Sequence, residues 1–72
     1  MTSRRFELHR DVDTTGISGV GVVADGVEFP DGLVVLRWAG GMRSTVVHDG
    51  GIRNVKAIHG HTGDTRIVWL DT

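Results

Sequence analysis

The stretch VVADGVEFPDGLVVLRW, residues 22–38, decides the fold because two valine-rich segments flank one strong turn signal. β-Branched residues favour strands. In the turn at 30–32, proline fixes φ, aspartate can accept a hydrogen bond from nearby backbone, and glycine supplies a positive φ. The stretch predicts a β-hairpin between strands over 20–29 and 33–40. The Asp-Gly pair at 25–26 interrupts the first strand and predicts a β-bulge there.

Strand patterns also lie on both sides of this hairpin. Phe6, Leu8 and Val12 are two or four residues apart, which predicts a first strand with one buried face. Two more strands are predicted over 43–49 and 65–70. The segment 65–70 has apolar residues on both faces, and this pattern predicts a central or doubly covered strand.

One segment departs from the strand pattern. In IRNVKAIHG the apolar residues Ile52, Val55 and Ile58 are three apart, so they share one face of a helix. We expect an α-helix or 3₁₀ segment of about two turns, ended by Gly60. Because an isolated helix of this length is marginal in water, it must pack against the sheet.

This order of elements predicts a mostly β fold, a small SH3-like, partly open barrel of about five strands with one short helix before the last strand. An OB-fold matches less well, because it would need a longer chain and a helix between its third and fourth strands. With 72 residues the chain is expected to form one domain over 1–72, with residues 1–5 as a loose N-terminus.

Composition narrows the function. The chain has no cysteine, which excludes disulfides and thiolate metal sites. Eight basic and nine acidic residues give a formal net charge of −1, which argues against a strongly basic nucleic-acid binder. No apolar run is long enough for a membrane span, and the N-terminus lacks the apolar stretch of a signal peptide. We therefore expect a cytoplasmic protein with no membrane partner.

The stretch IHGHTGDTR has two readings. The preferred one is a turn between helix and strand, with His59 near the helix end and no metal bound. The alternative is a zinc or other first-row metal site, since imidazole and carboxylate suit such ions. Its candidate ligands are His48, His59, His61 and Asp64. We expect no cofactor.

A partner-binding surface is predicted from two groups of residues. The glycine-rich segment TTGISG could present backbone N–H groups to a ligand, although it lacks the Gly-Lys-Ser/Thr ending of a P-loop. Strand arginines beside a tryptophan could form a stacking surface, although tryptophans in so small a domain are usually core. The predicted residues are Thr15, Gly16, Ser18, Gly19, Arg37, Trp38, Arg43 and Arg66.

Catalytic patterns are weak. The three serines, Ser3, Ser18 and Ser44, lack the setting of a nucleophile elbow, and the paired carboxylates lie at strand ends or turns. A chain of this size also has little room for a dry, preorganised pocket. We expect a protein that is not an enzyme.

The segments TGISGVG (15–21), DGLVVLRW (31–38) and HGHTGDTRIVW (59–69) resemble those of a set of short proteins from actinobacteria and their phages. The resemblance covers residues 6–71. It implies a bacterial or phage-infected cytoplasm and a protein that binds a component of the host or of its defences. It carries over no catalytic or binding residue.

We therefore expect a non-enzymatic binding module, phage- or prophage-encoded, that engages a host protein or associates with itself as a homo-oligomer. A small core that needs supplementing favours self-association. The alternative is a protein that sequesters a nucleotide or phosphate at a subunit interface. Nucleic-acid binding is a third and weaker alternative.

Overall fold

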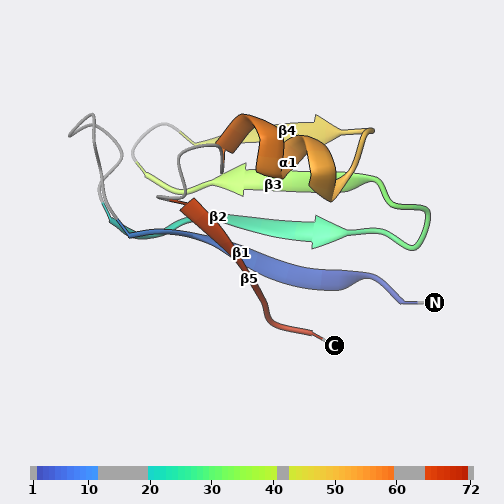
Figure 1. Ribbon diagram of the computed structural model, residues 1–72, viewed down its shortest axis with the longest axis horizontal. Coiled ribbons are helices and arrows are strands. Elements are labelled where there is room, and N and C mark those ends of the chain that lie inside the picture. Colours follow the sequence, from blue (N-terminus) through green and yellow to red (C-terminus); the bar gives the residue numbers. More distant parts are fainter. Residues whose placement is uncertain (1, 12–19, 41–42, 60–64, 72) are drawn as a thin grey trace.

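Five strands and one helix form in the predicted order (Figure 1). The computed structural model describes residues 2–11, 20–40, 43–59 and 65–71. The elements are β1 (Arg4–Arg10), β2 (Gly21–Glu28), β3 (Val34–Trp38), β4 (Ser44–His48), α1 (Ile52–His59) and β5 (Thr65–Trp69). The eight residues of α1 are too few to cross a bilayer, and the described residues include no other helix.

All neighbouring strands are antiparallel, in the order β4-β3-β2-β1-β5. Strands β1 to β4 form a meander, and β5 returns to pair with β1. This arrangement confirms the predicted mostly β fold with a short helix before the last strand. The sheet is open, with β4 and β5 as its two edges. Of the two alternatives predicted for 65–70, the central strand is wrong, because β5 has a strand neighbour on one side only.

The FPDGL hairpin forms as predicted. The Gly32 amide donates to the carbonyl of Phe29 at 2.9 Å, and the Phe29 amide donates to the carbonyl of Leu33 at 2.8 Å. The Asp31 side chain accepts a hydrogen bond from the Leu33 amide at 3.1 Å. Gly32 has a φ of 96°, the left-handed region that glycine adopts without a steric cost.

The bulge in β2 lies earlier than predicted. Leu8 of β1 pairs with Ala24 and His9 pairs with Val22, so Val23 is the extra residue. Both Val23 and Ala24 are buried, which an alternating strand would not allow. Gly26 has a different role, because a Cβ at this position would collide with the ring of Phe6. The Asp-Gly pair therefore marks a close approach and not the bulge.

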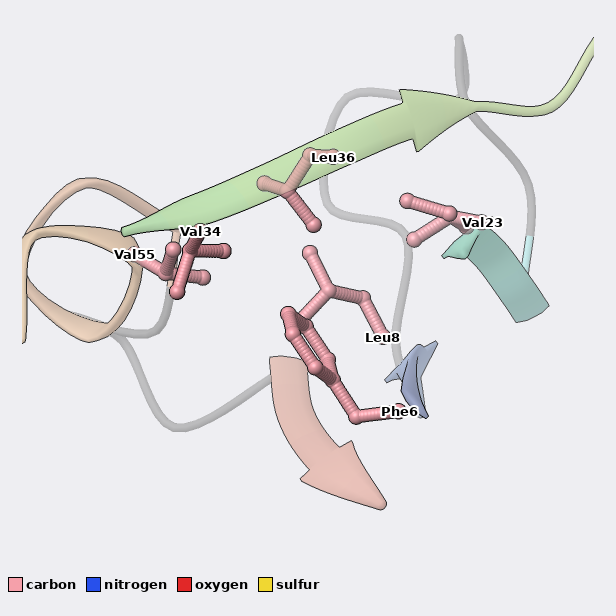
Figure 2. Packing of buried hydrophobic residues seen from close by; sticks show 7 residues of the cluster. Phe6, Leu8, Val23, Val34, Leu36 and Val55 are labelled. Atoms are coloured by element: carbon pink, nitrogen blue, oxygen red, sulfur yellow. The ribbon is translucent and has the colours of Figure 1, made fainter. Parts of the chain in front are cut away.

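The core lies on the face of the sheet that α1 covers, called here the helix face (Figure 2). The side chains of Phe6, Leu8 and Leu36 point toward one another, and Val55 of α1 lies beside Val34. These five side chains are at most 1% exposed. At ~25 cal/mol for each Å² of buried apolar surface, their burial is a major favourable contribution to folding. Trp38 and Trp69 pack against the edges of this core.

The N-terminal segment is more ordered than predicted. Strand β1 begins at Arg4, inside the segment that was expected to be loose. The Arg4 guanidinium donates to Oε1 of Glu28 at 2.7 Å and lies 4.0 Å from the centroid of the Trp69 ring system. Arg5 pairs with Asp71 at 3.0 Å. These contacts join β1 to β2 and to the C-terminal end of β5.

Candidate functional site

Three of the predicted partner-binding residues come together at one end of the sheet. Arg37 and Trp38 end β3, and Arg43 immediately precedes β4. Together with Asp25 of β2 they line a cleft of about 270 Å³. Gly40, with a φ of 115°, contributes to the wall of the cleft at the turn that follows β3.

The local structure explains how these side chains are placed. Arg37 lies opposite Asp25 in the β2–β3 register and opposite Thr45 in the β3–β4 register, so the three form one row across the sheet. Nη1 of Arg37 donates to Oγ1 of Thr45 at 3.3 Å. Because side chains alternate along β3, Trp38 lies on the helix face, where it is partly buried against the core. The cleft thus combines exposed charge with an anchored indole.

The charges of the cleft favour an anion. Two guanidinium groups, those of Arg37 and Arg43, face one carboxylate, that of Asp25, and this leaves one excess positive charge. A planar guanidinium offers several N–H donors that suit phosphate or carboxylate. The indole of Trp38 adds an apolar wall. The arrangement can bind a small anionic group, and it contains no nucleophile–base pair among the described residues.

Asp25 is a member of the cleft that was not among the predicted site residues. Because it precedes glycine, the sequence indicates only an interruption of the strand at this position. The signal that could have placed it is the hairpin register. The turn at 30–32 fixes which residues of β2 and β3 are opposite one another, and this pairing sets Asp25 against Arg37.

Arg66 does not belong to this cleft. It lies on β5, and strands β1 and β2 separate β5 from β3. Its Nε donates to Asp11 Oδ2 at 3.1 Å, so its charge is paired locally. The structure therefore does not bring Arg66 together with Arg37 and Arg43 in this cleft. The sequence does not show this separation, because it does not show that β5 joins the sheet at its far edge.

Most of the remaining predicted residues lie outside the described part of the chain. Thr15, Gly16, Ser18 and Gly19 lie outside the described residues, as do His61 and Asp64. Only the backbone of His59 is described, as the last residue of α1. His48 ends β4 and is 8% exposed. Across the described ranges, no three histidine, aspartate or glutamate side chains are grouped as metal ligands.

Strand β4 presents a second candidate surface, here called the β4 edge (Ser44–His48). The four residues 44–47 are exposed. Val47 is 57% exposed and lies in register with Val35 and, through β3, with Val27. These three valines form an apolar row, the valine row, on the face opposite α1. A protein partner could cover this row and pair with the strand at the same time.

The apolar surface continues to the hairpin. Phe29 is 43% exposed, and together with Pro30 and Leu33 it lines a shallow depression. On the other side of the sheet, a cleft of about 310 Å³ lies between α1 and β5. Its walls include Val55, Lys56, Ile67 and Trp69. This second cleft is mainly apolar.

A comparison with known families identifies the chain. The model of the Acb5 phage protein family matches residues 3–71. The chain belongs to this family. No curated protein sequence matches the chain, and no solved structure matches it. The Acb5 match therefore confirms the phage origin that the resemblance implied, and it covers both the cleft and the β4 edge.

Proposed function

We propose that this Acb5 phage protein is a non-enzymatic binding module that associates with protein, either a host protein or a second copy of itself. The β4 edge carries this proposal. It offers exposed backbone groups beside Val47 and the valine row, and no residue from 44 to 47 bears a charge. A strand of this kind readily adds another strand by main-chain hydrogen bonding.

The setting that we propose is the cytoplasm of an infected bacterium, an actinobacterium if the resemblance in sequence extends to the host. Three observations support a binding role. The chain is small, its core is contributed by one sheet and one short helix, and large apolar side chains remain exposed on β4 and at the hairpin. Exposed apolar patches on a small soluble domain typically mark interaction sites.

The test of this proposal is Val47→Lys. A lysine on the β4 edge opposes strand addition and breaks the valine row. Sedimentation equilibrium should show that the wild-type chain is heavier than its 7.8 kDa monomer, alone or with a host protein, and that the variant loses the association. Val20→Lys is the matched control, since Val20 is 65% exposed and lies outside β4. Equal association by both variants would contradict the proposal.

A second function is favoured by one specific observation, the grouping of Arg37, Trp38 and Arg43 around a single cleft. We propose as this alternative that the cleft sequesters a nucleotide or another small phosphate. Because Arg43 adjoins the β4 edge, such a site would lie next to a subunit interface if the chain dimerises. Sequestration of this kind involves no bond cleavage.

The alternative predicts that some member of a nucleotide panel raises the melting temperature. A ligand at 100 times its Kd would add ~2.7 kcal/mol to the free energy of unfolding. Arg37→Ala combined with Arg43→Ala should abolish the shift, whereas Arg53→Ala, an exposed arginine on α1, should leave it intact. A flat response to the whole panel would exclude this alternative. Affinity for an oligonucleotide that falls steeply with salt would point instead to nucleic-acid binding.

A further inference from the structure

The β4 edge lacks the protection that exposed edge strands usually have. Its sequence, STVVH, contains no lysine, proline or glycine, and the one ionisable residue, His48, is buried. Val46 and Val47 are exposed on opposite faces, at 36% and 57%. Natural sheets normally block such an edge with charge, proline or a bulge. An edge left open in this way is suited to pairing with another strand.

We propose that the strand that covers it is β4 of a second copy, paired antiparallel so that Val46 lies opposite its own equivalent. This inference rests on the proposed function and specifies its partner. The resulting dimer has a two-fold axis perpendicular to a continuous sheet of ten strands. An isologous contact of this type closes after two copies and leaves no further β4 edge exposed.

Symmetry limits the available registers. A two-fold axis perpendicular to the sheet keeps the helix face of one copy beside the helix face of the other. Residues that pair must therefore lie on the same face. This requires that one residue of β4 lies directly opposite its own equivalent, with the axis midway between the two. Within the central part of β4, the axis can pass through Thr45, Val46 or Val47.

Charge selects among these registers. Arg43 precedes β4 and Asp49 follows it, so each lies three residues from Val46. An axis through Val46 places Arg43 of each copy opposite Asp49 of the other and forms two ion pairs. An axis through Thr45 or Val47 forms neither. Both side chains are available for this, because both residues are exposed and neither is in an ion pair with another described residue.

The same register covers the exposed valines. The two Val46 side chains meet on the helix face, and Val47 lies beside Thr45 of the second copy on the opposite face. The β5 edge offers no equivalent. It carries Arg66, which is paired with Asp11 of its own chain. In a β5 pair centred on Ile67, Arg66 would face Val68 and would gain no acidic partner.

A cysteine scan tests the register directly, because the chain contains no cysteine of its own. In the proposed dimer the two residues at position 46 are ~5 Å apart between Cα atoms, within reach of a disulfide. The two residues at position 45, or at position 47, are diagonal neighbours ~8 Å apart, which is too far. Under mild oxidation Val46→Cys should become a covalent dimer, and Thr45→Cys and Val47→Cys should not.

Val47→Cys is the strict control, because position 47 is more exposed than position 46. Cross-linking by random collision would favour the more exposed thiol. A cross-link at 45 or 47 in place of 46 would overturn the proposed register. A monomer at all concentrations, with no cross-link at 46, would overturn the dimer.

Charge exchange gives an independent readout. Arg43→Asp alone, or Asp49→Arg alone, places like charges opposite one another twice per dimer and should raise the dimer dissociation constant about tenfold or more. The double variant Arg43→Asp/Asp49→Arg restores opposite charges in the same register and should recover the wild-type dissociation constant. Failure of the double variant to recover, when both single variants dissociate, would overturn the proposed pairing.

Failure of the dimer can be separated from failure of the proposed function. A photo-cross-linking amino acid at position 47, introduced into the chain in the host cell, should yield an adduct of twice the chain mass. Adducts to other proteins only, with a monomeric purified chain, would overturn the homodimer and leave a host protein as the partner of the β4 edge. No adduct of either kind would contradict both.

Discussion

The two edge strands of the sheet, β5 and β4, differ in their side-chain contacts. At the β5 edge, Trp69 packs against Phe6 with ring centroids 5.2 Å apart at an interplanar angle of 61°, and Arg4 lies over the Trp69 ring. Two ion pairs also lie at this edge, Arg66 with Asp11 and Arg5 with Asp71. At the β4 edge, the described side chains of residues 44–47 form no ion pair, and four consecutive residues are exposed.

This difference indicates a division of roles within one small sheet. The β5 edge joins the two ends of the chain by side-chain contacts, since β1 and β5 come from opposite termini. The β4 edge is left available although a small core would benefit from more cover. Under the proposed function, stability is concentrated at the β5 edge and association at the β4 edge. The predictions below test this contrast, beginning with the largest effect.

Trp69→Ala should destabilise the chain by about 3 kcal/mol, because loss of a large aromatic from a packed site removes buried surface and leaves a cavity. Val47→Ala, at the opposite edge, should change stability by no more than ~0.5 kcal/mol. Urea denaturation of dilute protein measures both, so that self-association does not add to stability. Equal losses at the two edges would contradict the contrast.

Gly26→Ala should cost about 1–3 kcal/mol, because a new Cβ would occupy the space of the Phe6 ring. That ring is 1% exposed and supports Trp69, so it has no free space to move into. The loss of stability in Gly26→Ala should depend on the size of the side chain at position 6. In a double-mutant cycle by denaturation, Phe6→Leu should cost less in the Gly26→Ala background than in the wild type. Additive losses would show that the Gly26 site is not limited by this ring.

Much of the fold followed from local chemistry. The hairpin at 30–32, the helix over 52–59 and the order of elements needed only turn residues and periodicity, and all three agree with the structure. The edge position of β5 did not follow. Apolar residues on both faces of 65–70 are typical of a central strand, yet Trp69 is partly covered by Arg4 and Phe6, which are more than 60 residues away in the chain.

The candidate site was predictable to the same extent. Arg37, Trp38 and Arg43 are close in sequence on either side of one turn, and their grouping follows from the β3–β4 connection. The separation of Arg66 from this cleft depends on the strand order, and the position of Asp25 opposite Arg37 depends on the register. Local pairs were therefore predictable, whereas relations across the sheet required its topology.

Arg4→Ala should destabilise by about 1 kcal/mol, since it removes both a cation–π contact with Trp69 and the ion pair with Glu28. Arg4→Lys should recover only part of this loss, because an ammonium lacks the flat guanidinium face. Arg37→Ala, near the β4 edge, should cost less than Arg4→Ala, since its hydrogen bond to Thr45 is exposed. Thermal melts suffice, because 1 kcal/mol shifts the Tm of a domain of this size by ~4–8 °C.

The smallest effect concerns pH at the end of β5. The Arg5 side chain donates to the Asp71 carboxylate, and with a further bond from the Arg5 amide it lowers the Asp71 pKa from 3.8 to about 2. A carboxyl group with a lowered pKa stabilises the fold above its unfolded-state pKa, and this contribution is lost as the pH falls from about 4 through about 2. Asp71→Asn should therefore melt slightly below the wild type at pH 6, and most of the difference should be lost as the pH falls through about 2.

The partner residue supplies the control. In Arg5→Gln the backbone amide still donates to Asp71, so the pKa of the carboxyl group should rise from about 2 only part of the way to 3.8. An NMR titration of the Asp71 carboxyl carbon measures this midpoint directly. An unchanged midpoint in Arg5→Gln would show that the guanidinium does not hold the carboxylate, and the β5 edge would lose one of the contacts that distinguish it from the β4 edge.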